Sequence, residues 1–376
     1  MNSTLPAQHR ALVLSEVGKP LLLEQRPLPK PGPGSARIRI LATSVRSNAS
    51  KVWRDPNSGH PLPLPLVPGF IAIGRVVDTG PDAIALSPGQ LVFFDPYIMG
   101  RDNSKAKYIS GFMEGFDEES RKLSRGEWRD STLAEYAKLP LENCHSMNEQ
   151  RLMGDPKDGG LGYTLRDLTH LFSMLIPFGG LADIDVKAGE TIIIAPATGR
   201  YGSAAVHLAL AMGARVIAIG RNAMILSQLA PISPRISTVQ ISNDIEKDTA
   251  ALAAVAGGTI DAFWDMSPTG AGTSTHFRSC LNVLSHGARI SLMGSVLSGT
   301  DFGYMDIMGR GLTIKGTWMC TRQQTKRLIT MVETGVLPLG ERAGMGPVRS
   351  FPLEQWEEAL NTSVERTEPG EIIIVS

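Results

Sequence analysis

The chain has 376 residues, and its 37 Lys+Arg balance its 37 Asp+Glu, so the formal net charge is zero. This length suits two domains with sizeable cores, and the balanced charge favours neither a nucleic-acid nor an anionic-membrane partner. The three cysteines, Cys144, Cys280 and Cys320, are far apart and odd in number, which argues against a disulfide framework. No apolar run is long enough to span a bilayer and MNSTLPAQHRALVL does not resemble a signal peptide, so we expect a cytoplasmic protein.

Residues 1–160 have the pattern of a β-rich domain. Short apolar runs alternate with turns rich in proline and glycine, such as PLPKPGPGS and SGHPLPLPLVPG. The predicted strands are ALVL, ARIRILAT, FIAIGRVVDTG, QLVFF and LAEYAKLP.

The segment 98–130 interrupts this pattern. Its run GFMEGFDEESRKLSRGEWRD is charged and irregular, and it predicts an inserted loop with a short helix. A long loop of this kind either shapes a pocket or acts as a lid, or it is a solvated surface excursion. The composition favours neither alternative.

The stretch Thr191–Arg221, TIIIAPATGRYGSAAVHLALAMGARVIAIGR, predicts a strand, a tight glycine turn, a helix and a second strand. Gly199 and Gly202 let the backbone approach a pyrophosphate, and a helix starting near Ser203 presents its positive end to that anion. This order is typical of a dinucleotide-binding unit, although Ala197 stands in place of the first glycine. The alternative is a buried strand–helix connection with incidental glycines.

The end of the second strand indicates which dinucleotide binds. A carboxylate there would hold a ribose 2′-hydroxyl and repel a 2′-phosphate, whereas this chain has Gly220-Arg221. A guanidinium favours the 2′-phosphate, so the sequence predicts NADPH over NADH.

The strand–helix alternation continues with predicted strands in ISTVQIS, IDAFWDM, ARISLMG and LTIKG. It predicts a parallel sheet with helices on both faces and a ligand at the carboxyl ends of the strands. The residues expected near the cofactor are Thr198, Gly199, Arg200, Tyr201, Gly202, Gly220, Arg221, Asn222, Ser267, Gly294, Ser295 and Thr317.

The order of a β-rich domain, a nucleotide unit and a short return resembles the medium-chain dehydrogenase/reductase superfamily. The resemblance is carried by LPLVPGFIAIGRVVDTGPDAIALSPGQLVFF, by VKAGETIIIAPATGRYGSAAVHLALAMGARVIAIGRN, and by the later ARISLMG, LTIKGTW and EIIIVS. It is greatest to the zinc-independent quinone and enoyl reductases, fungal enzymes included. It implies an α/β protein with a GroES-like catalytic domain over 1–160, completed by 319–376, and a Rossmann NADPH-binding domain over 161–318. It also allows a homodimer that pairs through the sixth strand of the cofactor domain.

The departures from that superfamily concern zinc. Zinc-dependent members place a cysteine where this chain has Val45, and His-Glu where it has Phe70-Ile71. Their third ligand would fall near Pro177-Phe178, and no cysteine or histidine is there. We therefore expect no catalytic zinc, and we interpret the seven histidines, His207 included, as surface or packing residues.

Without zinc, a plain ketone loses its strongest polarising group, whereas a conjugated acceptor spreads the charge of the arriving hydride onto oxygen. We therefore expect NADPH-dependent reduction of an activated C=C bond in an enone, enal or enoyl group, or of a quinone, in a small molecule such as a secondary metabolite. The alternatives are a zinc-free carbonyl reductase or alcohol dehydrogenase on the same scaffold, and a non-catalytic NADPH-binding protein.

The resemblance also suggests site residues in the first domain. Ser47 matches the hydroxyl relay of alcohol dehydrogenases and is the candidate proton donor, with a self-capping turn serine as the alternative. Lys51 falls where quinone reductases carry a pocket tyrosine, with a solvated lysine as the alternative, and Arg46 matches a position that contacts the pyrophosphate. The aromatic residues expected to line a substrate pocket, or else to belong to the core, are Trp53, Phe70, Phe178 and Trp318.

Overall fold

The computed structural model describes residues 5–296 and 302–376, which divide into two compact units. Unit 1 contains residues up to Phe172 together with Val348–Thr367 and Glu371–Ser376, and unit 2 contains Ser173–Pro347 and Glu368–Gly370. The sequence placed these boundaries at 160/161 and 318/319. The contacts assign the segment 319–347 to unit 2 and divide the chain within helix α5 (Leu171–Asp183).

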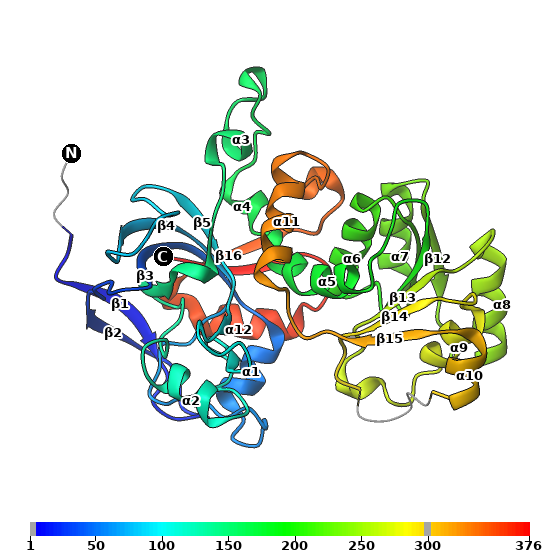
Figure 1. The fold of residues 1–376 in the computed structure, drawn as a ribbon, viewed down its shortest axis with the longest axis horizontal. Coiled ribbons are helices and arrows are strands. Elements are labelled where there is room, and N and C mark those ends of the chain that lie inside the picture. The colour runs from blue at the N-terminus through cyan, green and yellow to red at the C-terminus, as the bar shows by residue number, and fades with distance from the viewer. Residues whose placement is uncertain (1–4, 297–301) are drawn as a thin grey trace. The chain divides into compact units, whose positions relative to one another are not determined.

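Unit 1 is built on a mixed sheet in the order β16-β17-β3-β4-β5-β9, with β8 paired to β3 (Figure 1). The pair β16-β17 is parallel, and the other pairs are antiparallel. Alternate residues of β3 and β4, such as Ile38, Ile40 and Val76, point into its apolar core. Two smaller sheets, β1-β2 and β6-β7, complete the unit. Its strands are β1 (Gln8–Val13), β2 (Leu22–Pro27), β3 (Ser35–Ser44), β4 (Ala72–Thr79), β5 (Leu91–Phe94), β6 (Tyr97–Met99), β7 (Lys107–Ile109), β8 (Tyr136–Pro140), β9 (Cys144–Ser146), β16 (Val348–Pro352) and β17 (Glu371–Val375).

The helices of unit 1 are short. They are α1 (Ser47–Arg54), α2 (Glu118–Arg125), α3 (Glu149–Met153), α4 (Leu165–Leu168) and α12 (Trp356–Glu365), with 3₁₀ turns at Leu141–Asn143, Pro156–Asp158 and Leu353–Gln355. The short helix expected in the segment 98–130 is therefore confirmed as α2. The strands β6 and β7 in the same segment had no sequence signal.

Unit 2 is a six-stranded parallel sheet in the order β12-β11-β10-β13-β14-β15. This is the doubly wound order: β10 is central, β11 and β12 are added on one side of it, and β13, β14 and β15 are added on the other. The strands are β10 (Thr191–Ala195), β11 (Arg215–Gly220), β12 (Ile236–Gln240), β13 (Ala262–Asp265), β14 (Arg289–Leu292) and β15 (Thr313–Gly316). All six strands predicted from the sequence are confirmed.

Helices cover both faces of this sheet (Figure 1). Besides α5, the helices of unit 2 are α6 (Arg200–Ala211), α7 (Ala223–Leu229), α8 (Ile245–Ala256), α9 (His276–Val283), α10 (Tyr304–Arg310) and α11 (Arg322–Glu333), with 3₁₀ turns at Ala230–Ile232, Thr269–Ala271 and Glu341–Ala343. Consecutive residues of the central strand, Ile192 to Ala195, are all fully buried because each face is covered. The polar loops are therefore confined to the strand ends, where the predicted cofactor residues lie.

Candidate functional site

The glycine turn after β10 is the first part of the cofactor edge, by which we mean the loops at the carboxyl ends of the unit 2 strands. Helix α6 begins at Arg200, one turn earlier than the predicted start near Ser203, with Gly199 as its N-cap. Gly199 provides no side-chain cap, so the first N–H groups of the helix have no partner from that residue. A Cβ at Gly202 would overlap the Pro196 carbonyl oxygen, so only glycine allows this tight turn. The turn thus has the form of a phosphate cradle.

The end of β11 lies directly against this turn. The Ala197 amide donates to the Ile219 carbonyl at 2.7 Å, and a Cβ at Gly220 would come within 2.8 Å of the Thr198 hydroxyl. Arg221 follows with an exposed side chain. Asn222 is the N-cap of α7, and its side-chain oxygen accepts from the Ile225 amide at 3.2 Å. Arg221 is therefore available to an anion, whereas the Asn222 oxygen already has a structural partner.

The ends of β13 and β14 form the second part of the edge. Ser267 is buried, and its hydroxyl donates inward to the Asp265 carboxylate at 2.7 Å. The Ser295 amide donates to the Ser267 carbonyl at 2.9 Å, which joins the two loops. Gly294 and Ser295 are exposed. The structure therefore directs the Ser267 side chain into the interior, and a contact of this residue with a cofactor would have to use its backbone.

The end of β15 is fixed by Asp183, the last residue of α5. The Thr317 hydroxyl donates to Asp183 at 2.7 Å, and the Gln324 amide donates to the other carboxylate oxygen at 2.9 Å. The Cys320 thiol contacts the Leu175 carbonyl at 2.8 Å, which holds the following segment on the same helix. Trp318 lies between them in the chain, just after the end of β15, and is 37% exposed.

A nicotinamide dinucleotide fits this edge. The glycine turn, the N-terminus of α6, the exposed Arg221 and the strand-end loops lie at the carboxyl ends of neighbouring parallel strands, where doubly wound sheets bind such ligands. Thr198, Arg200 and Tyr201 are partly exposed on the turn itself.

In unit 1, the predicted residues Ser47 and Lys51 lie on α1. Both are exposed, and their spacing of four residues places them on one face of the helix. Arg46 precedes them and is buried, with its guanidinium 3.2 Å from the buried Glu371 carboxylate of β17. This ion pair had no sequence signal, and the predicted contact of Arg46 with a pyrophosphate stays a prediction.

Trp53 and Phe70 belong to an aromatic cluster with Phe112 from the segment 98–130. The ring centroids of Phe70 and Phe112 are 4.6 Å apart, and those of Trp53 and Phe112 are 5.6 Å apart. The indole N–H of Trp53 donates to the Gly111 carbonyl at 2.9 Å. All three side chains are buried. In this structure they therefore form the interior of unit 1 rather than an open pocket wall.

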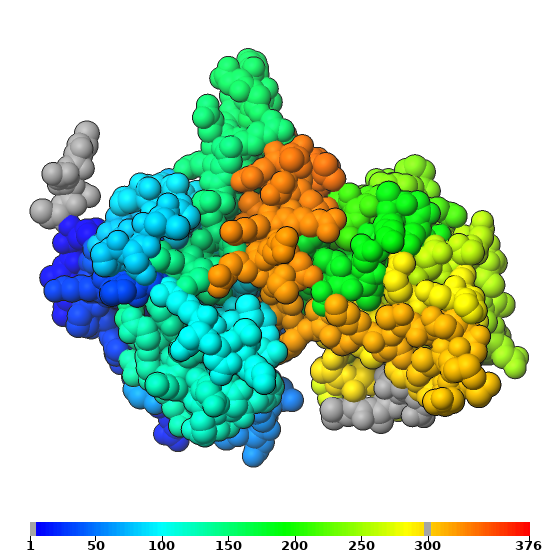
Figure 2. Space-filling model, in the orientation of Figure 1, coloured from blue at the N-terminus to red at the C-terminus, as the bar shows by residue number. Residues whose placement is uncertain are grey.

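The segment 98–130, which we call the insert, is held by this cluster and by close backbone contact. Residues 108–114 are buried, and Gly111 approaches Gly69 so closely that a Cβ would overlap the Gly69 carbonyl oxygen. In Figure 2 the insert, coloured cyan to teal, lies flush on unit 1, whereas the green segment around α3 projects from it. The alternative of a wholly solvated excursion is therefore wrong for the inner half of the insert.

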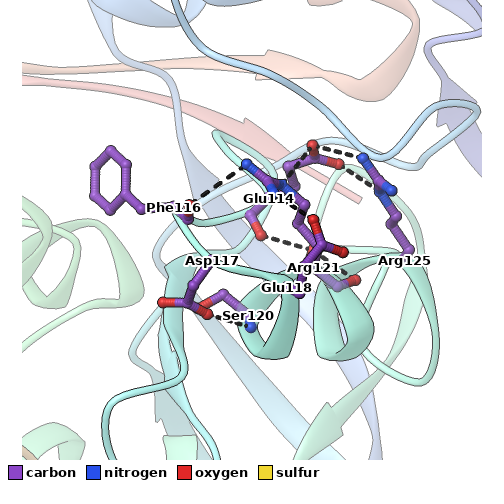
Figure 3. A network of polar contacts seen from close by, with 8 residues as sticks. Glu114, Phe116, Asp117, Glu118, Ser120, Arg121 and Arg125 are labelled. Atoms are coloured by element: carbon purple, nitrogen blue, oxygen red, sulfur yellow. Dashed lines mark hydrogen bonds and ion pairs between the residues drawn. The ribbon is translucent and has the colours of Figure 1, made fainter.

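The outer half of the insert is organised around Glu114 (Figure 3). This buried carboxylate receives two hydrogen bonds from Arg125, at 2.7 and 2.8 Å, and lies 3.4 Å from Arg121. Asp117 caps α2 by accepting from the Ser120 amide at 2.7 Å. Hydrogen bonds from Ser120, first from its hydroxyl and then from its amide, hold the pKa of the Asp117 carboxyl below its usual range. The side chain of Phe116, between these two acids, is exposed.

The donor set does not fit zinc. The positions where zinc-dependent relatives would carry ligands hold Val45, Phe70, Ile71, Pro177 and Phe178, which have no metal-binding atoms. Phe178 has no exposed surface, and Arg327 lies over its ring at 5.9 Å. Within residues 5–296 and 302–376, no three His, Cys, Asp or Glu side chains are grouped to hold a metal ion. The three cysteines are buried, form no disulfide, and burial raises the pKa of the Cys280 thiol.

Sequence reasoning missed Phe112, Asp183, Asp265 and His276. The last two form a buried polar network with Ser267, in which His276 Nε2 is 2.9 Å from the Ser267 hydroxyl. Asp265 lies next to the end of the strand predicted in IDAFWDM, and its place near a strand end could have indicated it. No local pattern relates it to His276, eleven residues later.

Comparison with known proteins agrees with the two-unit architecture. The chain matches the alcohol dehydrogenase GroES-like domain over residues 32–149 and the zinc-binding dehydrogenase family over residues 202–334. An L-threonine 3-dehydrogenase from Ruegeria pomeroyi is 25% identical over 330 residues, which cover 87% of this chain and 90% of that protein.

Solved structures show the same fold. The cobalt- and zinc-bound thermostable alcohol dehydrogenase from Pyrobaculum aerophilum has a TM-score of 0.72 and 20% identity, covering 98% of this chain and 100% of that one. A protein from Sinorhizobium meliloti 1021 bound to NADP has a TM-score of 0.73 and 19% identity, covering 99% and 100%.

A GroES-like unit joined to a doubly wound unit with a dinucleotide turn defines a dehydrogenase-type oxidoreductase. The chain belongs to the medium-chain dehydrogenase/reductase superfamily, as its sequence resemblance predicted. The α/β fold class with both domain types is confirmed. In the described part of the chain, no helix has the length and apolarity to cross a bilayer.

Proposed function

We propose that this protein is a zinc-independent, NADPH-dependent oxidoreductase that delivers hydride to an activated C=C bond, in an enone, enal or enoyl group, or to a quinone. The observation that carries the proposal is the packing of Trp53, Phe70 and Phe112. Phe70 stands where zinc-dependent relatives carry a ligand, and its ring packs at a tilted angle against Phe112, with the ring centroids 4.6 Å apart. A reaction that needs no Lewis acid suits such a site.

The preference for NADPH rests on Arg221. Its side chain is exposed at the end of β11, where an acid would hold the 2′-hydroxyl of NADH. A planar guanidinium forms charge-assisted hydrogen bonds to a phosphate, and the exposed position leaves it free to do so.

In the proposed reaction, the bound cofactor supplies the hydride. The chain's own residues orient it: the α6 end and Gly202 hold the pyrophosphate, and the strand-end loops hold the nicotinamide half. Ser47 is the candidate donor of the one proton the acceptor needs, and Lys51, on the same face of α1, is the candidate group that exchanges this proton with solvent. If the substrate is open to water, solvent replaces Ser47 as the donor.

The decisive experiment uses NADPH deuterated at C4, each face labelled separately, with a panel of α,β-unsaturated aldehydes, ketones and quinones. NMR of the product locates the deuterium. Deuterium on the β-carbon is the expected result for enones and enals. A purified protein that holds tightly bound zinc and loses activity when a chelator removes it would overturn the zinc-independent part of the proposal.

A second candidate is favoured by the names of the curated relatives, L-threonine 3-dehydrogenases, which act on an alcohol group. If this second function is correct, the protein is a zinc-free carbonyl reductase or alcohol dehydrogenase. Deuterium on the carbonyl carbon would identify it. NADPH binding without turnover of any acceptor would instead indicate a non-catalytic NADPH-binding protein.

We further propose that two copies pair through β15. This strand is at the edge of the sheet, bonded only to β14, and Thr313, Lys315 and Gly316 are exposed. An open edge can extend a sheet into a second copy. Light scattering of the purified protein should give twice the chain mass of 40.4 kDa, and a monomer at micromolar concentration would contradict the pairing.

A further inference from the structure

A buried polar network lies beneath the ends of β13 and β14. Asp265, Ser267 and His276 are 2%, 1% and 4% exposed. The Ser267 hydroxyl donates to Asp265 Oδ1 at 2.7 Å, and His276 Nε2 is 2.9 Å from that hydroxyl and 3.2 Å from the same carboxylate oxygen. On the other side of the ring, the Ser274 hydroxyl is 2.7 Å from His276 Nδ1.

One placement of hydrogens satisfies all four side chains. With its proton on Nε2, His276 donates to Asp265 and Ser267, and its Nδ1 accepts from the Ser274 hydroxyl. Ser267 then donates to Asp265 and accepts from His276. Buried polar groups that are fully paired in this way rigidify the backbone that carries them.

This network is not a nucleophilic triad. In a triad the serine and the carboxylate bond to opposite nitrogens of the imidazole, so that the acid orients the base. Here both are at Nε2, and the Ser267 hydroxyl is already committed to the carboxylate. Ser267 is also buried, so a substrate cannot reach its hydroxyl. The network therefore has a structural role and does not cleave a bond.

The network holds two loops against each other. The Met293 amide donates to the Asp265 carbonyl at 2.8 Å, and the Ser295 amide donates to the Ser267 carbonyl at 2.9 Å. A Cβ at Gly294 would come within 3.1 Å of the Asp265 carboxylate, so the second loop crosses directly over the first. Both loops follow neighbouring strands at the cofactor edge.

We propose that His276 is a positioning residue for the nicotinamide cofactor. It acts through Ser267 and Asp265 to fix the backbone of residues 265–267 after β13 and 293–295 after β14, and it does not touch the cofactor itself. The inference rests on the proposed function only in that a nicotinamide cofactor binds at this edge. The Ser267 hydroxyl then bonds to Asp265 and His276, and the backbone of the loop contacts the cofactor.

The test compares His276→Phe, which keeps a ring and loses every hydrogen bond, with His276→Gln, whose amide N–H can replace Nε2–H. Ser279→Ala is the matched control, because Ser279 is a fully buried hydroxyl on the same helix that bonds only to the backbone carbonyls of Ile245 and Thr275. For each full-length protein, the Kd for NADPH is measured by calorimetry and the amide exchange of Ser267 and Ser295 by NMR.

We expect His276→Phe to weaken NADPH binding about tenfold or more, because buried partners are left unpaired and the loops loosen. The Ser267 and Ser295 amides should exchange faster, KM for NADPH should rise more than kcat falls, and His276→Gln should recover most of the affinity. Ser279→Ala should leave the Kd unchanged. If His276→Phe does not fold, Ser274→Ala, which removes only the outer contact of the ring, should weaken binding severalfold.

An unchanged Kd and unchanged exchange in a folded His276→Phe or Ser274→Ala would overturn this inference. Equal losses in Ser279→Ala would do the same, because they would show a general loosening of α9. A wild-type protein that binds neither NADPH nor NADH would instead overturn the proposed function.

Discussion

The cofactor edge of unit 2 and the insert of unit 1 are built by different means. The edge is assembled from local signals: a strand, a glycine turn, a helix N-terminus and a basic residue within 31 consecutive positions, Thr191–Arg221. The insert is held by contacts between distant residues, such as Trp53 with Gly111 and Phe70 with Phe112. The cofactor edge can be predicted from sequence because its signals lie in neighbouring residues. The packing of the insert cannot, because it depends on residues far apart in the chain.

The difference also concerns where glycine is needed. At the cofactor edge, Gly202 allows a backbone to turn against its own neighbour, Pro196. In the insert, Gly111 allows two segments 42 positions apart in the chain, at Gly69 and Gly111, to touch through their backbones. The same residue type thus makes a ligand site in one region and a tertiary contact in the other, and substitutions can separate these roles.

The largest expected effect is that of Gly111→Ala on stability. Gly111 has φ +76°, and a Cβ there would overlap the Gly69 backbone. Gly59 is the matched control, since it has φ +74° and nothing within 4 Å of its Cβ position. We expect Gly59→Ala to cost about 1–2 kcal/mol from backbone strain alone, and Gly111→Ala roughly 1–3 kcal/mol more from overlap. Denaturant unfolding measures both, and equal losses would show that the insert contact is dispensable.

Gly202→Ala tests the same idea at the cofactor edge, with Gly309→Ala as its control because Gly309 lies in α10, outside the glycine turn, and a Cβ there meets nothing within 4 Å. Moving the turn away from Pro196 displaces the α6 N–H groups from the pyrophosphate. We expect NADPH binding to weaken about 100-fold in Gly202→Ala, as for the loss of two charge-assisted hydrogen bonds. Gly309→Ala should keep an affinity close to that of the wild type, as measured by calorimetry. Similar losses in both would mean that the turn does not hold the phosphates.

The sequence predicts the features of this protein that depend on neighbouring residues, and it does not predict those that depend on distant ones. All six strands of unit 2 and the positions of the loops after them were predictable, because each strand is a short apolar run followed directly by turn residues. The start of α6 was placed one turn late, because Gly199 caps the helix without a polar side chain and so leaves no signal. The pairing of Arg46 with Glu371, the position of Phe112 and the inward direction of Ser267 depend on residues brought together only by folding.

Arg221→Ala tests whether the basic residue after β11 determines the preference for NADPH over NADH. Removing the guanidinium should weaken NADPH about tenfold or more, the usual contribution of a charge-assisted hydrogen bond to a phosphate, and should change NADH binding little. The Kd of each cofactor is measured for both proteins. The neighbouring Asn222→Ala is a useful control, because its oxygen caps α7 and its loss should lower stability without changing the NADPH-to-NADH ratio. Equal losses of both cofactors in Arg221→Ala would place the 2′-phosphate elsewhere.

The smallest effect concerns a single hydrogen bond of the insert. Trp53→Phe keeps an aromatic ring against Phe112 but removes the N–H that donates to the Gly111 carbonyl at 2.9 Å. Because Gly111 is buried, its carbonyl would lose a partner that water cannot easily replace, at a cost of about 1–2 kcal/mol in the free energy of unfolding. Amide exchange across 106–114 should quicken while NADPH affinity stays unchanged, since the contact lies wholly within unit 1. A loss of NADPH affinity in this variant would show that the insert and the cofactor edge are coupled, and the separation drawn between the two regions would fail.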